Sequence, residues 1–222
     1  MKELLLKLKE AVELGKVDFN SPFPPQLKGQ NGASEYAKTA LDENIPPQDI
    51  LNEALIPAMD VVGKKFSANK IFVPQMLMSA KAMGAAMMYL KPLFQSGEIK
   101  SKGTFIMGTV KGDLHDIGKN LVSMMIEGSG WTMIDLGVDV PSEKYIEALR
   151  ENDGAVVGMS ALLTTTMVNM QGIVNDIRRE FNDTKILIGG APVNSEFADK
   201  IGADFYSPDP QGAVEYLNEL VG

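Results

Sequence analysis

From residue 104 to the end of the chain, short apolar runs alternate with segments of helical periodicity. The runs predict β-strands at 104–110, 131–137, 155–159, 185–189 and 203–206, and the segments between them predict helices at 117–129, 141–152, 166–182, 195–201 and 210–221. Strands that alternate with helices form parallel sheets covered on both faces. Since crossover connections are right-handed and a polar loop follows the first strand, we expect an α/β domain with a five-stranded parallel sheet in the flavodoxin-like order.

Residues 1–95 lack this alternation and show helical periodicity instead. Apolar residues recur at helical spacing in four segments, at 1–15, 34–44, 46–68 and 75–94. Ser34 is the expected N-cap of the second helix, and Pro57 predicts a kink in the third. A loop rich in proline and glycine occupies 19–33. We therefore expect a helical bundle at 1–95, a polar linker at 96–103 and the sheet domain at 104–222.

The composition excludes several kinds of function. The formal net charge of −8 argues against nucleic acid as a main partner. The chain has no cysteine, so disulfides, iron–sulfur clusters and thiolate zinc sites are excluded. Charged residues interrupt the apolar start, and polar side chains interrupt the uncharged stretch 154–175. We therefore expect a cytoplasmic protein without a signal peptide or a membrane span.

Unusual loops follow three of the predicted strands. The first contains His115, the only histidine among the 222 residues, between two carboxylates and two glycines. The second is the Ser/Thr-rich stretch 158–166, and the third holds Gly189 and Gly190. Because the carboxyl ends of parallel strands meet at one edge, the loops together predict a groove for a long ligand with polar ends. Each loop alone also fits a plainer role, as a helix cap or a turn.

Several chemistries can be weighed for the histidine loop. A single imidazole beside a carboxylate can ligate one face of a metal or transfer a proton, and the residues alone leave both open. A Walker A phosphate loop is excluded because five residues, not four, separate the two glycines and no Ser or Thr follows the lysine. A zinc hydrolase using Asp113, His115 and Asp116 is poor in ligands. Ser160 is a candidate nucleophile, but no nucleophile elbow surrounds it.

Together, the three loops resemble the cobalamin-binding domain of methionine synthase and of methyltransferase corrinoid proteins. The matching pattern is Asp113-x-His115-x-x-Gly118, then Ser160-x-Leu162, then Gly189-Gly190. Residues 112–120 and 135–141 are similar to the methyl-carrying branch of that family, and 66–76 resemble its helical cap domain. The resemblance covers about 34–222 and implies a cap followed by a flavodoxin-like cobalamin domain.

The resemblance implies a role for each part of the pattern. His115 would be the lower cobalt ligand, Asp113 would hold its other ring nitrogen, and Thr166 stands where methionine synthase completes this relay with a serine. Ser160 and Leu162 would contact the nucleotide tail, and the paired glycines would leave it room. The residues that the resemblance assigns to cofactor binding are Gly112, Asp113, His115, Asp116, Ile117, Gly118, Ser160, Leu162, Thr164, Gly189, Gly190, Phe66, Val73 and Met76.

Three apolar residues of the helical region match the family's cap. Phe66, Val73 and Met76 correspond to side chains that cover the upper, methyl-bearing face of the cofactor, with Val73 in place of a leucine. An apolar lid would shield cobalt from light-driven cleavage and from oxidation. Ordinary packing inside a helical bundle is the alternative explanation for the same three residues.

The resemblance therefore implies a corrinoid methyl carrier. It would bind cobalamin base-off with histidine as ligand and shuttle a methyl group through Co(I) and methyl-Co(III). Its partners would be a donor-specific methyltransferase, an acceptor methyltransferase and a reductive activator, with no nucleic acid and no membrane. The chain would be a carrier subunit, not a complete enzyme, and nothing in it selects the methyl donor. The alternatives are a cobalamin-sensing regulatory protein, a dissociated mutase subunit and a nucleotide-binding flavodoxin-like module.

Overall fold

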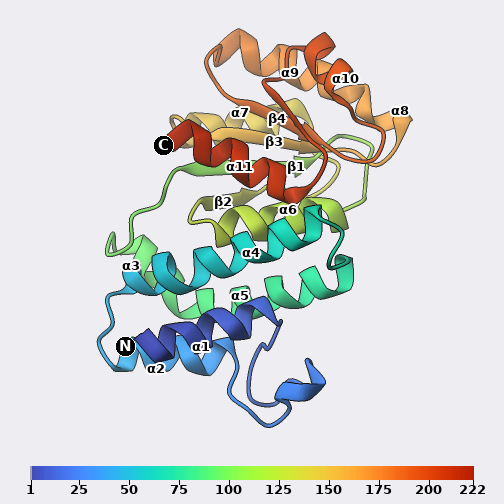
Figure 1. The fold of residues 1–222 in the computed structure, drawn as a ribbon. Coiled ribbons are helices and arrows are strands. Elements are labelled where there is room, and N and C mark those ends of the chain that lie inside the picture. The colour runs from blue at the N-terminus through green and yellow to red at the C-terminus, as the bar shows by residue number, and fades with distance from the viewer. Residues whose placement is uncertain (1) are drawn as a thin grey trace. The chain divides into compact units, whose positions relative to one another are not determined.

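The computed structural model describes residues 2–222, and the chain divides into two compact units. The first unit runs to Ser101 and includes Gly128–Gly130, and the second comprises Lys102–Glu127 and Trp131–Gly222. The first is built from helices, and the second contains the sheet (Figure 1).

The first unit consists of helices joined by short turns, apart from the long loop between its first two α-helices. Its elements are α1 (Lys2–Glu13), the 3-10 turn η1 (Pro25–Leu27), α2 (Ala33–Asp42), α3 (Pro47–Ile50), the π-helical turn η2 (Leu51–Leu55), α4 (Ile56–Ser67) and α5 (Val73–Gln95). Apolar residues spaced three or four apart are fully buried, for example Leu8 and Val12 on α1 and Leu55 and Val62 further along. This confirms the predicted helical region before the sheet.

Two details of the helical unit differ from the prediction or refine it. At η2, the Ile56 N–H donates to the Leu51 carbonyl five residues back, immediately before Pro57. Because proline has no N–H to donate, the helical ladder is interrupted here, and the wider turn takes up the change. The predicted N-cap of α2 was wrong: the cap is Gly32, whose N–H is accepted at 2.8 Å by the carboxylate of Glu35.

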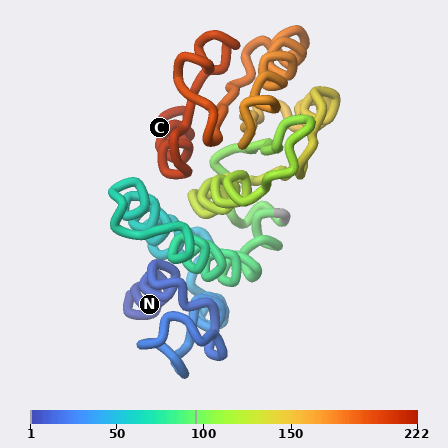
Figure 2. Tube along the Cα trace, turned by 90° about the vertical axis from the view of Figure 1, so that its right-hand side faces the viewer, coloured from blue at the N-terminus to red at the C-terminus, as the bar shows by residue number. Residues whose placement is uncertain are grey.

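The proline-rich loop is a surface excursion fixed at both ends (Figure 2). Glu35 also accepts the N–H of Phe19, at 3.1 Å, so one carboxylate joins the two ends of the loop. The ammonium group of Lys16 is fully buried and donates to the Ser21 carbonyl at 2.7 Å. Charged side chains therefore hold a segment that has little apolar core of its own.

The second unit is a parallel sheet with helices on both faces. Its strands are β1 (Thr104–Thr109), β2 (Thr132–Asp135), β3 (Val156–Ser160), β4 (Ile186–Gly189) and β5 (Phe205–Ser207), in the order β2-β1-β3-β4-β5. The helices are α6 (Ile117–Gly128), α7 (Ser142–Glu151), α8 (Thr164–Met167), α9 (Asn169–Glu180), α10 (Ser195–Ile201) and α11 (Pro210–Val221). The predicted α/β class and flavodoxin-like strand order are confirmed.

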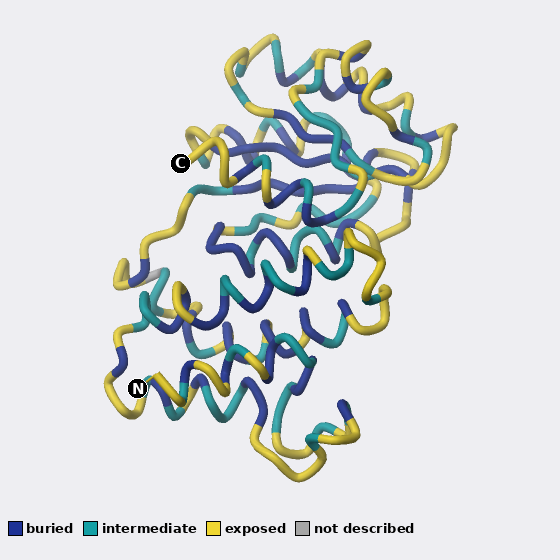
Figure 3. Tube along the Cα trace, in the orientation of Figure 1, coloured by how far each residue is buried: buried dark blue, intermediate teal, exposed yellow. Residues whose placement is uncertain are grey.

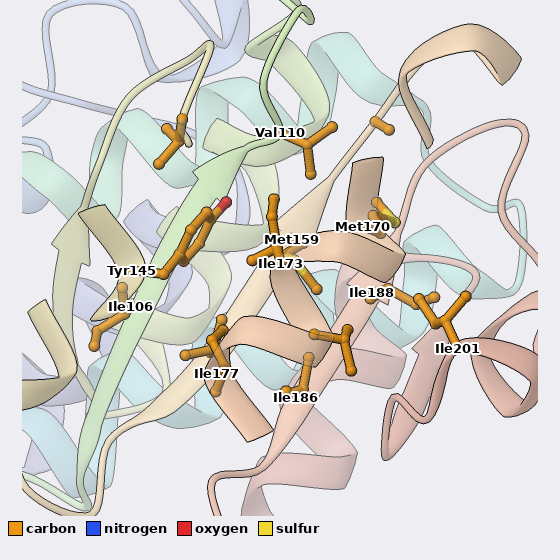
Figure 4. Close-up of a cluster of buried hydrophobic side chains, with 14 of the residues drawn as sticks. Ile106, Val110, Tyr145, Met159, Met170, Ile173, Ile177, Ile186, Ile188 and Ile201 are labelled. Atoms are coloured by element: carbon orange, nitrogen blue, oxygen red, sulfur yellow. The ribbon is translucent and has the colours of Figure 1, made fainter. Parts of the chain in front are cut away.

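The sheet is covered on both faces, which explains its continuous apolar strands. On one face α7, α9 and α10 pack through a hydrophobic cluster that includes Tyr145, Ile173 and Ile188 (Figure 4). Helices α6 and α11 lie on the other face (Figure 1). The middle strands β1, β3 and β4 are buried along most of their length (Figure 3). In the sequence, such strands are continuous apolar runs, without alternation of apolar and polar residues.

The register brings the three predicted loops together. Thr109 pairs with Ser160, and Ser160 pairs with Gly189, so β1, β3 and β4 end side by side. The single helix expected at 166–182 is divided into α8 and α9. Across residues 2–222, no helix is both long and apolar enough to cross a bilayer.

Candidate functional site

The histidine loop joins β1 to α6 and is anchored by the strand that precedes it. The Thr109 hydroxyl donates to the His115 carbonyl at 2.8 Å, which closes the loop on itself. The Val110 N–H donates to the Ser160 carbonyl at 3.0 Å and ties the loop to the end of β3. The backbone around His115 is thus fixed by the sheet edge.

Asp113 is the buried centre of the site. Its side chain is 0% exposed, and each carboxylate oxygen accepts two hydrogen bonds. Oδ1 accepts the backbone N–H of His115 at 3.1 Å and lies 2.7 Å from His115 Nδ1. Oδ2 accepts the Leu162 N–H at 2.8 Å and the Thr166 hydroxyl at 2.6 Å. A buried carboxylate whose two oxygens each accept two hydrogen bonds is held in one orientation.

These contacts fix the ionisation of Asp113 as well as its position. Burial by itself raises the pKa of the Asp113 carboxyl, because it disfavours the charged form. The hydrogen bonds from Thr166, Leu162 and His115 outweigh burial and hold the pKa well below its usual value. Asp113 is therefore ionised near neutral pH and can accept a hydrogen bond from a protonated imidazole nitrogen.

His115 is held at one ring nitrogen and open at the other. Nδ1 faces the Asp113 carboxylate at 2.7 Å, so in the neutral ring Nδ1 carries the proton and Nε2 carries the lone pair. Nε2 has no hydrogen-bond partner among the described residues, and the side chain is 51% exposed. This is the tautomer and orientation that a metal-ligating histidine requires.

Thr166 completes a chain of three groups. Its hydroxyl lies 2.6 Å from Asp113 Oδ2 and 3.0 Å from the Leu163 carbonyl, but it has a single proton to donate. The shorter, charge-assisted contact with the carboxylate is the stronger of the two. The structure thus brings Asp113, His115 and Thr166 together, and the extra methyl group of threonine does not displace the hydroxyl.

The loop that contains Ser160 and Leu162 has a structural role in addition to the expected contact with the ligand. Leu162 holds Asp113 through its backbone N–H, a role that the side chain type does not reveal, while its side chain is 45% exposed. The hydroxyls of Ser160 and Thr164 make no hydrogen bond within the described chain. Both remain available to an external ligand, as does the Leu162 side chain.

The structure restricts a side chain much more strongly at Gly190 than at Gly189. A Cβ on Gly190 would lie 1.8 Å from the Ala161 carbonyl oxygen, and its φ is +125°, so the chain itself requires glycine there. A Cβ on Gly189 would lie 3.2 Å from the Ser207 carbonyl, which is tight but less severe. Gly190 thus lets two loops of the sheet edge approach closely, apart from any space it leaves for a ligand.

The remaining predicted residues of the histidine loop lie at the start of α6. Asp116 is exposed and accepts the side-chain amide of Asn120 at 3.1 Å, so it does not join Asp113 at the imidazole. The Ile117 side chain is 65% exposed, and nothing lies within 4 Å of a Cβ built on Gly118. These positions leave open space beside His115.

Two acidic residues next to the site were not assigned a role from the sequence. Asp135, at the end of β2, accepts the buried ammonium of Lys119 at 2.5 Å. Asp139, in the loop between β2 and α7, accepts the Gly112 N–H at 2.7 Å and has a φ of +55°. The similarity of 135–141 to the family pattern was the one signal that this loop matters.

The three predicted cap residues belong to the helical unit. Phe66 lies at the end of α4 and is partly exposed. Val73 is the first residue of α5 and is 38% exposed, whereas Met76 is fully buried one turn later. The burial of Met76 agrees with the alternative explanation, in which this residue packs inside the helical bundle.

The residues present fit a corrinoid better than a free metal ion. Among residues 2–222, no group of three or more His, Cys, Asp or Glu side chains could hold an ion. Large apolar side chains are instead exposed on the two loops that meet at Asp113, at Leu114, Ile117, Leu162 and Leu163. A single imidazole amid apolar surface suits a planar macrocycle that brings its own equatorial ligands.

Comparisons with known proteins agree with this chemistry. A B12 binding domain matches residues 103–214, and a second B12 binding domain matches 30–91. Dimethylamine corrinoid protein 1 of Methanosarcina acetivorans is 39% identical over 192 residues, which cover 85% of this chain and 88% of that protein. Trimethylamine corrinoid protein 1 of the same organism is 35% identical over 223 residues, covering 99% and 97%.

A solved structure is similar over nearly the whole chain. The crystal structure of the methanol:cobalamin methyltransferase complex MtaBC from Methanosarcina barkeri matches with a TM-score of 0.81 and 28% identity, covering 99% of this chain and 80% of that one. The domain matches, the relatives and the buried Asp113 beside a half-exposed histidine point the same way. The chain belongs to the family of corrinoid proteins that carry a B12 binding domain.

Proposed function

We propose that this chain is the methyl-carrying corrinoid subunit of a methyltransferase system, with His115 as the lower ligand of a base-off corrinoid. The observation that carries the proposal is the Thr166–Asp113–His115 chain, which leaves Nε2 as the free nitrogen of the only histidine. When bound, the corrinoid would supply the methyl-transfer chemistry, through Co(I) and methyl-Co(III) states of its cobalt.

In this proposal the chain's own residues hold, orient and tune the ligand. Asp113 keeps the proton on Nδ1 and so keeps Nε2 unprotonated for ligation. Because the carboxylate stays ionised through its hydrogen bonds, it also increases the electron density that the imidazole can donate. Thr166 and the Leu162 N–H prevent Asp113 from turning away. The hydroxyls of Ser160 and Thr164 would bind polar groups of the nucleotide tail.

The partners follow from the relatives. The similar solved structure is a methanol:cobalamin methyltransferase complex, and two relatives are corrinoid proteins named for dimethylamine and trimethylamine. We infer that this chain likewise docks with a donor-specific methyltransferase and an acceptor methyltransferase. A reductive activator would be needed whenever the cobalt is oxidised out of the cycle.

Corrinoid uptake and methyl transfer test the proposal. Protein incubated with hydroxocobalamin under reducing conditions should retain it through gel filtration and show a base-off, histidine-ligated absorption spectrum. The His115→Ala variant should lose that spectrum, while Glu151→Ala, an exposed change at the end of α7, should keep it. The loaded protein should then accept and release a methyl group with partner methyltransferases. Corrinoid-dependent DNA binding without methyl transfer would instead favour the regulatory alternative.

A further inference from the structure

The loop between β2 and α7 contacts the histidine loop at several backbone positions. The Thr109 N–H donates to the Gly137 carbonyl at 3.0 Å, and the Val140 N–H donates to the Thr109 carbonyl at 2.9 Å. Asp139 lies between these two anchors and is one of the few residues other than glycine with a positive φ, at +55°. Aspartate tolerates this left-handed conformation better than most side chains, but it is not the cheapest choice, which would be glycine.

Asp139 forms hydrogen bonds with the backbone on both sides of the Asp113 Cα atom, from which the Asp113 side chain projects. Its carboxylate accepts the Gly112 N–H at 2.7 Å, and its own N–H donates to the Asp113 carbonyl at 3.0 Å. Gly112 has a φ of +83°, so the chain turns sharply just before Asp113. Among the described residues, these contacts are the ones that tie this turn to the neighbouring loop.

We propose that Asp139 is a positioning residue for the lower ligand: by clamping the Gly112–Asp113 turn, it sets the distance between Asp113 and His115 and thereby the strength of histidine ligation. The proposal rests on the proposed function of His115. Asp139 itself makes no hydrogen bond with the imidazole. Its action is indirect, through the 2.7 Å contact between Asp113 Oδ1 and His115 Nδ1, which weakens steeply as the atoms separate.

Three substitutions separate the side-chain contact from the backbone conformation. Asp139→Gly keeps the positive φ but removes the acceptor for Gly112. Asp139→Ala removes the acceptor and disfavours the positive φ. Asp139→Asn keeps an acceptor oxygen and tolerates the positive φ, so it serves as the conservative rescue. Asp153→Asn, at an exposed turn of the same unit, controls for a lost surface charge.

Two measurements then read the effect on His115. Because the chain has one histidine, ¹⁵N-histidine labelling of a tag-free protein gives the NMR signals of His115 alone. In the apo-protein, Asp139→Gly and Asp139→Ala should shift the Nδ1 signal toward that of a weaker hydrogen bond, and Asp139→Asn should not. With cobalamin, the first two variants should bind about fivefold more weakly, the effect of one hydrogen bond, and show a smaller histidine-ligated fraction.

The outcomes distinguish the inference from the function on which it rests. If Asp139→Gly lowers the melting temperature but leaves the His115 signal and the histidine-ligated fraction at wild-type values, Asp139 is merely structural and the inference is overturned. If the wild-type protein takes up no corrinoid in a histidine-ligated form, the proposed function fails instead. The apo-protein signal still reports whether Asp139 positions the Asp113–His115 pair in that case.

Discussion

The loop after β1 and the loop after β4 both carry part of the residue pattern that resembles the cobalamin-binding domain, yet their residues are required for different physical reasons. In the histidine loop, Asp113 and His115 are side chains placed for chemistry, one buried and one half exposed. In the glycine loop, Gly190 is required by the backbone, since a Cβ would lie 1.8 Å from the Ala161 oxygen. One pattern thus mixes residues that make the site with residues that make the fold, and only geometry separates them.

The largest expected effect on stability is at the glycine loop. Gly190→Ala should lower the free energy of unfolding by about 3 kcal/mol or more, because it adds a steric clash to an unfavourable φ. The matched control is Gly202→Ala, where φ is +77° and no atom lies within 4 Å of the added Cβ, so the loss should be about 1 kcal/mol. Urea unfolding of the apo-protein measures both, and equal losses would mean that the close approach to Ala161 is not what demands glycine.

Asp113→Asn should have the next largest effect, about 2 kcal/mol near neutral pH, because an amide cannot accept from all four donors. Since folding lowers the pKa of Asp113, its stabilisation is complete above the ordinary carboxyl pKa of about 3.9 and is lost as pH falls below that value. The difference between wild-type and variant should therefore shrink in acid. Unfolding measured from pH 7 downward tests this, and a gap that widens in acid would contradict the lowered pKa.

Thr166→Val should cost less, about 1 kcal/mol, because it removes one hydroxyl and keeps the shape. Asp113 Oδ2 would retain only the Leu162 N–H. Thr166→Ser is the matched control and should stay close to wild-type in both stability and corrinoid affinity. The comparison is read from urea unfolding and cobalamin titration of the two variants. A serine variant as weak as the valine variant would show that the hydroxyl alone is not sufficient and that the methyl group of Thr166 also contributes.

His115→Ala should have the smallest effect on stability, about 0.5 kcal/mol, because the imidazole is half exposed and water can replace it as a donor to Asp113 Oδ1. It should nevertheless abolish histidine ligation. A variant that keeps its unfolding midpoint and loses its ligated spectrum sharpens the contrast with Gly190→Ala, whose main effect should be a lower free energy of unfolding of the apo-protein. A large loss of apo-protein stability in His115→Ala would show that the imidazole also supports the fold.

Much of the fold could be predicted because the strands are buried on both faces. Apolar runs followed by turn residues marked all five strands, and their alternation with helices indicated the parallel order. Local caps were harder to predict. Ser34 has a good capping side chain, but Glu35 reaches back to Gly32, so the cap and the start of the helix lie two residues earlier than predicted. Such competition between neighbouring caps depends on tertiary contacts.

The site was predictable where its chemistry resides in side-chain type and not where it resides in the backbone. The resemblance to the cobalamin-binding family led to Asp113, His115 and Thr166, and the structure brings the three together. The N–H of Leu162 and the clamp from Asp139 could not be predicted, because any residue offers an N–H and a positive φ at aspartate leaves only a weak signal. The need for glycine at 190 depends on Ala161, a neighbour distant in the sequence.

Electron paramagnetic resonance of the Co(II)-loaded protein is the measurement that tests the central claim most directly. Because His115 is the only histidine, labelling with ¹⁵N-histidine changes a single possible axial nitrogen. The account predicts that the axial nitrogen splitting changes from a triplet in unlabelled protein to a doublet in labelled protein, and that it disappears in His115→Ala. A splitting that is identical in labelled and unlabelled wild-type protein, or absent from both, would show that His115 does not ligate cobalt.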